Sequence, residues 1–273
     1  MGRRERRLAK ERKDRIGAFL GAVALLVLLG LYAWGQVIEP PELDGANCPA
    51  DGRYAAQIAI LVDPSDTLTV VQASVGGRIL DLIENEAPET AEIRVFTVAR
   101  TGRQDTSAVL RLCKPQHPED ASSAPGSQRH AIDEYQENFI DPLRMTLSTL
   151  LDAAGDSISP ILEAIQVVAV NSFQPRDDRS IPRRLIVVSD MIQNSGNHSF
   201  YTDPVDFGDL SRNPDYGTLR VDLSGVSVSV FLLARRSQAG RIQQGGLHRF
   251  WEDYFIDSGV EPGRELRWIA VEG

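Results

Sequence analysis

Oxygen-bearing side chains stand at the ends of apolar segments in this 273-residue chain. Residues 63–67 read DPSDT directly after an apolar run, Ser159 precedes Pro160, and Asp190 follows the apolar run Leu185–Ser189. Carboxylates and hydroxyls are hard ligands, which suit Mg²⁺, Mn²⁺ or Ca²⁺ better than zinc. Binding a cation through these residues requires no activated nucleophile. The residues therefore predict the binding of a divalent cation.

The segments around these residues alternate between strand and helix patterns. Short apolar runs rich in β-branched residues are typical of buried strands, whereas apolar stripes spaced by three or four residues predict helices. Strands are predicted at Ala55–Val62, Ile93–Ala99, Ala108–Cys113, Leu185–Ser189, Val226–Leu233 and Leu266–Val271. Helices are predicted at Thr67–Glu86, Ile132–Ala154 with a bend or restart near Pro142, Ser159–Val170 and Leu247–Ser258.

This alternation predicts an α/β fold with a Rossmann-like, doubly wound and mostly parallel sheet. The connection RTGRQDTS at residues 100–107 is short, so the strand that ends at Cys113 is expected to be an antiparallel edge strand. Ligands of such sheets bind outside the carboxyl ends of the strands. Residues 63–67 and Asp190 are expected at that edge.

Three sequence elements resemble the metal-ion-dependent adhesion site of the von Willebrand factor A (vWA) family, whose first strand ends in Asp-x-Ser-x-Ser. The first element stands here as Asp63-x-Ser65-x-Thr67. The second, SPILEAI, is similar to the family's T-P-L-x-E-A-L and places Ser159 on the threonine position. The third, RRLIVVSD, ends in Asp190. Their order along the chain is also that of the family.

The resemblance implies a bacterial-type, membrane-anchored vWA-like domain over about residues 53–271. It implies a bound Mg²⁺, or else Mn²⁺ or Ca²⁺, and a protein partner whose carboxylate completes the site. Direct oxygens would come from Ser65, Thr67 and Ser159, whereas Asp63 and Asp190 would act mostly through bound water. Two residues depart from the family pattern. Thr67 stands where the family has serine, and Ser159 stands where it has threonine. A third is Met191, which replaces the usual glycine and leaves the following turn in doubt.

Other interpretations of the same residues stay open. Asp63 and Ser159 could cap helices, and Asp190 could simply end a strand. A metal-dependent hydrolase such as a haloacid dehalogenase-like phosphatase would need an acid where Ser65 stands, so we expect no enzyme. G-x-S-x-G and P-loop motifs are missing as well. A structural subunit of an envelope assembly with a vestigial metal site is the remaining alternative.

The N-terminus predicts a membrane anchor. Residues 1–15 carry eight Lys/Arg and three Asp/Glu, and residues 16–38 carry no charge. About 20 apolar residues span a hydrocarbon core, and the positive-inside rule places residues 1–15 in the cytoplasm. We therefore expect a single pass through the inner (cytoplasmic) membrane and a periplasmic or extracytoplasmic domain. A cleaved signal peptide is the alternative, although Ala33-Trp34-Gly35 is a weak cleavage site.

The domain boundaries follow from this topology. Residues 1–15 are assigned to a basic tail, 16–38 to the transmembrane helix, 39–52 to a Pro- and Gly-containing linker, and 53–273 to the vWA-like domain. Cys48 and Cys113 lie on the outer side, where an even pair favours a disulfide, with two unrelated buried thiols as the alternative. If the first strand runs towards the metal face, this disulfide lies at the opposite edge and the metal face points away from the bilayer.

The loop that follows Asp190 is polar and contains interleaved aromatic residues. This pattern suits a recognition surface, so Asn194, Ser195, Phe200 and Tyr201 are candidate partner-binding residues. The alternative is that the aromatic side chains pack beneath the loop. The chain outside residues 1–15 has a net charge of −14, which argues against a nucleic-acid partner.

Overall fold

A computed structural model describes residues 17, 19–30, 42–63, 68–98, 107–119, 127–153, 158–173 and 180–272. The chain divides into two units, Met1–Glu42 and Leu43–Gly273. The second unit begins before the predicted domain start at residue 53, so residues 43–52 of the predicted linker belong to the compact part.

The first unit contains a helix over residues 19–30, which fall within the predicted membrane span 16–38. The rest of that span lies mostly outside the described residues. Among the helices of the described residues, none combines the length and the apolar character needed to cross a bilayer.

The second unit is built on a sheet that has six strands in the described residues, in the order β3-β2-β1-β4-β5-β6. The strands are β1 (Gln57–Val62), β2 (Glu92–Thr97), β3 (Leu110–Cys113), β4 (Arg183–Ser189), β5 (Val226–Leu233) and β6 (Leu266–Val271). β3 runs antiparallel to β2, and all other neighbours are parallel. This is the strand order of the doubly wound Rossmann-like fold, so the predicted fold class is confirmed.

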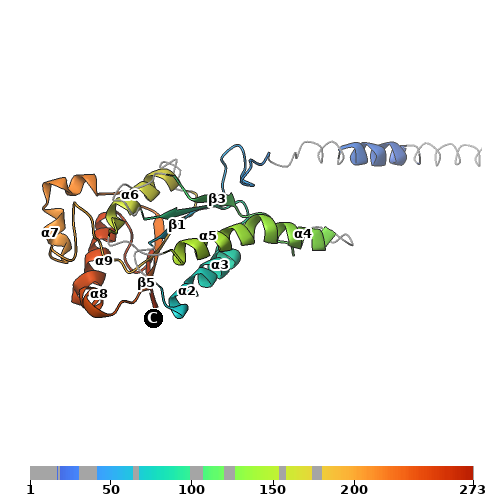
Figure 1. Ribbon diagram of the computed structural model, residues 1–273. Coiled ribbons are helices and arrows are strands. Elements are labelled where there is room, and N and C mark those ends of the chain that lie inside the picture. Colours follow the sequence, from blue (N-terminus) through green and yellow to red (C-terminus); the bar gives the residue numbers. More distant parts are fainter. Residues whose placement is uncertain are drawn as a thin grey trace, which may run out of the picture. The chain divides into compact units, whose positions relative to one another are not determined.

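Helices cover both faces of this sheet (Figure 1). They are α2 (Val70–Ala73), α3 (Val75–Glu86), α4 (Ser127–Tyr135), α5 (Asp141–Leu151), α6 (Ile161–Ser172), α7 (Phe207–Ser211), α8 (Ser237–Ile242) and α9 (His248–Asp257). The π-helical segments η1 (Gln136–Ile140) and η3 (Gln243–Leu247) and the 3₁₀ helix η2 (Pro214–Thr218) adjoin them.

The alternation of side chains along β1 divides the core into two layers. Ala59 and Leu61 face the cluster beneath α6 and α9, whereas Ile58, Ile60 and Val62 face the cluster beneath α3 and α5. All five are buried, as expected for a strand covered on both faces. The sheet is therefore a rigid platform, and its carboxyl edge can hold side chains in fixed positions.

Some helix boundaries differ from the predicted ones. The predicted helix 67–86 is two helices, α2 and α3. Thr69 and Gln72 form a reciprocal cap at the start of α2, in which each backbone N–H binds the other side chain at 3.1 and 3.3 Å. The predicted change near Pro142 is present as a π-helical segment, η1, that leads without a break into α5, and Pro142 lies in the first turn of α5. The loop predicted after Asp190 contains α7 and η2.

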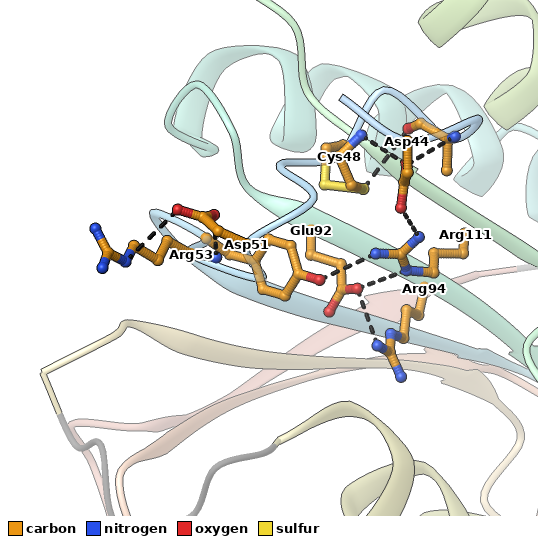
Figure 2. The surroundings of a disulfide bond; sticks show 10 residues. Asp44, Cys48, Asp51, Arg53, Glu92, Arg94 and Arg111 are labelled. Carbon is orange, nitrogen blue, oxygen red and sulfur yellow. Dashed lines mark hydrogen bonds and ion pairs between the residues drawn. A yellow bond between two sulfur atoms is a disulfide. The ribbon is translucent and has the colours of Figure 1, made fainter. Parts of the chain in front are cut away.

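A disulfide joins Cys48 and Cys113, whose Cα atoms are 4.9 Å apart (Figure 2). Cys113 pairs with Glu92 at the start of β2, and Glu92 pairs with Gln57 at the start of β1. The disulfide therefore lies at the amino edge of the parallel strands, opposite to Asp63. This agrees with the predicted pairing and its predicted edge.

An ion-pair network supports the disulfide edge (Figure 2). The Arg111 guanidinium donates to Asp44 Oδ2 and to Glu92 Oε1, both at 2.7 Å, and to the Tyr54 hydroxyl at 3.0 Å. Glu92 is 1% exposed and also accepts from Arg94 at 2.9 Å. The Arg111 hydrogen bond, with backbone N–H groups of Cys48 and residue 46, lowers the pKa of Asp44 to about 2. The network holds the entry segment against β2 and β3.

We predict that replacing both Cys48 and Cys113 by serine lowers the free energy of unfolding. The disulfide closes a loop with a sequence separation of 65, which corresponds to about 4 kcal/mol in the chain-entropy treatment. Urea denaturation of the oxidised wild type and of the double variant measures the difference. Reductant should destabilise the wild type by the same amount and leave the double variant unchanged. Equal midpoints for all samples would contradict the prediction.

Candidate functional site

The Asp63 carboxylate is the centre of a polar cluster at the carboxyl edge of the sheet. Asp63 follows β1 directly and is 3% exposed. Its Oδ2 atom accepts hydrogen bonds from Ser159 Oγ at 2.7 Å and from Ser189 Oγ at 2.8 Å. Three segments that are far apart in the sequence thus meet at one carboxylate oxygen.

The sheet and one loop bridge set this geometry. In the parallel register Val62 lies beside Val188, and the Asp63 N–H donates to the Val188 carbonyl at 2.9 Å. Asp63 and Ser189 therefore reach the same level of the edge. Ser159 is fixed by a backbone bridge with Asn194, in which the N–H groups of the two residues donate to each other's carbonyls at 2.9 and 2.8 Å. The predicted convergence of Asp63 and Ser159 is present.

Asp190 follows β4 at the same edge, but it is engaged by an arginine. Its Oδ1 atom accepts from the Ile192 N–H at 2.9 Å, and its Oδ2 atom accepts from Arg235 Nε at 3.0 Å. The side chains of Arg235 and Asp190 are only 6% and 9% exposed. Asp190 therefore takes part in a buried ion pair with a residue that lies just after β5.

Gln243 connects this ion pair to the surrounding backbone. Its side-chain oxygen accepts from the Arg235 N–H at 2.8 Å, and its Nε2 atom donates to the carbonyls of Asp190 at 3.0 Å and of Leu233 at 2.9 Å. Ser189, Arg235 and Gln243 were not among the residues predicted from the sequence. Arg235 could have been identified from the sequence, since it follows a predicted strand that ends at the same edge. No sequence pattern pointed to Gln243, because it reaches the site from a separate segment.

The structure corrects one role considered for Ser159. Its hydroxyl donates to Asp63 and does not cap α6, which begins after Pro160 without a side-chain cap of its own. Gln193 Oε1 instead accepts from the Leu162 N–H at 3.0 Å, so a side chain from the neighbouring loop satisfies one of the free N–H groups at this helix start.

The turn after Asp190 has a left-handed backbone at Met191, the position where the resembling motif has glycine. Met191 has φ of +61° and is fully buried. Its N–H donates to Ser189 Oγ at 2.8 Å, and its carbonyl accepts from Trp251 Nε1 at 2.7 Å. A left-handed conformation is unfavourable for a side chain with Cβ, so these bonds and the packing hold the turn in place.

Glu163 of α6 holds the loop that follows. Its carboxylate accepts from Ser195 Oγ at 2.7 Å, from Gln193 Nε2 at 3.0 Å and from Asn197 Nδ2 at 3.1 Å. The predicted partner-binding residue Ser195 is thus anchored to α6, and Asn194 is anchored to Ser159. Both residues lie on a positioned loop beside the Asp63 cluster.

The aromatic residues of this loop divide into buried and exposed members. Phe200 is 4% exposed, and its ring lies 4.7 Å from the ring of Phe250 and 6.3 Å from that of Trp251. Its assignment to a partner-binding surface is corrected, because it packs beneath the loop. Tyr216 is also buried. Tyr201 is 46% exposed, so among the predicted aromatic contacts it is the one available to a partner.

The described oxygen donors fit a hard cation. Asp63, Ser159 and Asp190 offer carboxylate and hydroxyl oxygens at one edge, which suit Mg²⁺, Mn²⁺ or Ca²⁺. Ser65 and Thr67 lie outside the described residues. Within the described ranges, no three carboxylate, imidazole or thiol groups converge as metal ligands. Direct coordination through this edge would therefore depend on hydroxyls as well as carboxylates.

His198 is a buried titratable group in the same loop. Its ring packs near Phe200 and Phe250, and its Nδ1 atom lies 3.5 Å from Asp203 Oδ2. Burial lowers the pKa of His198, and the nearby charges of Asp203 and Glu163 oppose this effect only in part. The neutral imidazole is therefore the form that the folded loop favours.

No protein-family model matches this sequence, and none of the curated proteins is detectably similar to it. Solved structures are similar at low identity. The conserved hypothetical protein BatB from Bacteroides thetaiotaomicron is 12% identical, with a TM-score of 0.37 over 80% of this chain and 91% of that chain. An aerotolerance-related membrane protein from Bacteroides fragilis NCTC 9343 is 14% identical, with a TM-score of 0.35 over 79% and 91%. The manganese-loaded TRAP protein of Plasmodium vivax is 12% identical, with a TM-score of 0.33 over 79% and 68%.

We predict that Ser189→Ala destabilises the protein by about 1–3 kcal/mol, the usual cost of leaving a buried polar group without its partner. The substitution removes one donor to Asp63 and the acceptor of the Met191 N–H. Urea denaturation measures the loss. Ser148→Ala, at an exposed position of α5, is the matched control and should stay within about 0.5 kcal/mol of wild type. An equal effect of both substitutions would contradict the assigned role of Ser189.

We also predict that acid destabilises the fold through His198. Because the folded pKa is lowered, the unfolded chain takes up the proton first as pH falls below about 6.5. Stability should then decrease by up to about 1.4 kcal/mol per pH unit until the folded pKa is reached. Urea denaturation from pH 7.5 to 5 should show a smaller slope for His198→Gln. His130→Gln, which changes an exposed side chain, should keep the wild-type slope.

Proposed function

We propose that this chain is a membrane-anchored, extracytoplasmic vWA-like module that binds a protein partner through a divalent cation. The observation that carries the proposal is the convergence of Asp63, Ser159 and Ser189 in one hydrogen-bonded cluster, with Asp190 beside it. Each of the three resembling motifs contributes a residue to this edge.

The proposed cation is Mg²⁺, with Mn²⁺ or Ca²⁺ as alternatives, because the donors are hard oxygens. Ser159 would offer a direct ligand, and Asp63 and Asp190 would orient bound water. Ser65 and Thr67 keep their proposed roles as direct ligands. A cation at a shallow edge keeps an open coordination position, which a carboxylate of the partner would fill.

The proposed recognition surface lies on the loop after β4. Glu163 and Ser159 hold this loop in a defined conformation through Ser195 and Asn194. Tyr201 offers an exposed ring beside these polar groups, and such aromatic residues often contribute strongly to protein interfaces. The chain enters the compact unit near the disulfide, at the amino edge of the sheet. The entry segment therefore does not cover the carboxyl edge, where Asp63 lies.

The proposed class is a binding module and not an enzyme. The side chains around Asp63 are hydroxyls that donate to it, and the cluster needs no nucleophile to bind a cation. A structural envelope subunit with a vestigial metal site is the second candidate. The Arg235–Asp190 ion pair favours this alternative, because it supplies a positive charge where the cation would act.

We predict that Mg²⁺ or Mn²⁺ raises the melting temperature of the purified full-length chain. A ligand at a hundredfold excess over its Kd stabilises the native state by about 2.7 kcal/mol. Differential scanning fluorimetry with and without the cation measures the shift. Asp63→Ala should abolish it, whereas Asp81→Ala, at an exposed position of α3, should retain it. An equal shift in Asp63→Ala would contradict the proposed site.

The partner is tested by chemical crosslinking in membranes and recovery of the tagged chain, with and without a chelator. A specific partner should be recovered from wild type and from Asp81→Ala, and it should be lost with chelator or with Asp63→Ala. Recovery that does not depend on the cation would favour the structural-subunit alternative.

A further inference from the structure

Arg235 occupies a position that bears directly on the proposed cation. Its Nε atom donates to Asp190 Oδ2 at 3.0 Å, and both side chains are almost completely buried. An ion pair at the protein surface contributes little, because water screens it. This pair is shielded from water, so the guanidinium and the carboxylate interact strongly.

The backbone around Arg235 is fixed independently of its side chain. Gln243 binds the Arg235 N–H at 2.8 Å and bridges to the carbonyls of Leu233 and Asp190. These Gln243 bonds go to backbone atoms, so they do not use the guanidinium that pairs with Asp190.

The guanidinium and a divalent cation compete for the same carboxylate. With Arg235 in place, Asp190 Oδ2 already faces a positive charge, and Oδ1 binds the Ile192 N–H. A divalent cation that used Asp190 would meet repulsion from Arg235 at short range. Cation binding therefore requires the guanidinium to leave Asp190, or proceeds against its charge.

We propose that Arg235 is a resident counter-cation that holds the site closed by pairing with Asp190, and that the divalent cation binds by displacing it. This inference rests on the proposed cation-binding function and adds a device that weakens the affinity. The chain would then bind its cation only at high concentration, or together with a partner that stabilises the open form.

The test is Mn²⁺ binding to the purified full-length chain, followed by loss of the EPR signal of free Mn²⁺. Arg235→Gln should bind Mn²⁺ at least roughly tenfold more tightly than wild type, because the competing charge is gone. Arg235→Lys keeps the charge and should stay close to wild type. Arg241→Gln makes the same charge change at an exposed position of α8 and is the matched control.

The outcomes distinguish this inference from the proposed function. Tighter Mn²⁺ binding by Arg235→Gln, and not by the other variants, supports the inference. If the wild type binds no Mn²⁺ in that case, the inference still holds, but the proposed cation-dependent function of the wild type fails. Equal or weaker binding by folded Arg235→Gln overturns the inference and leaves the proposed function standing. No binding by either chain overturns both. An equal gain in Arg241→Gln overturns the inference, since the effect would then be one of net charge.

A second measurement on the wild type keeps the inference testable if Arg235→Gln does not fold. The Arg235 Nε–H resonance, assigned by its loss in Arg235→Lys, should exchange slowly with water because it is buried and bonded to Asp190. Saturating Mg²⁺ should shift this resonance and accelerate its exchange. A resonance that stays protected and unshifted while Mg²⁺ moves the melting temperature would overturn the inference.

Discussion

A buried carboxylate at the end of β1 is the constraint on which the carboxyl edge depends. Removing an ionised group from water is costly unless hydrogen bonds replace the lost solvation. Ser159 and Ser189 supply such bonds to Asp63 from two other segments. The hydrogen bonds to Asp63 therefore fix the start of α6 and the end of β4 relative to β1. The loop after β4 is positioned by both of these segments.

The strands were predictable because their signals are local. β5 and β6 have the predicted bounds. β5 is a buried run with alternating valines, which has few alternatives, whereas β6 is an edge strand of which only Val271 is buried. Helix starts were less predictable, because their free N–H groups accept partners from anywhere in the fold. Gln193, from another loop, accepts a hydrogen bond from an N–H group at the start of α6. Ser159, the residue expected to cap this helix, donates to Asp63 instead.

In the loop after β4, the composition likewise did not show which residues make contacts inside the fold. Its mixture of polar and aromatic residues suggested a recognition surface, but a sequence does not say which residues face inward. Phe200 packs against Phe250 and Trp251, while Glu163 binds the polar residues beside it. Most of the polar and aromatic side chains named here therefore hold the loop in place, whereas the Tyr201 side chain is partly exposed to solvent.

The character of the site depends on a residue outside every resembling motif. Asp63, Ser159 and Asp190 were predicted from their places at strand and helix ends and from the resembling motifs, but the same residues can serve a cation site or an internal ion pair. The position after β5 decides between these uses, because a neutral side chain there leaves Asp190 for a cation, whereas Arg235 neutralises it. The electrostatic attraction for a divalent ion then depends mainly on Asp63, whose oxygen already accepts two hydroxyls. The resembling motifs therefore lead to this edge of the sheet, but they do not include Arg235, which pairs with Asp190 there.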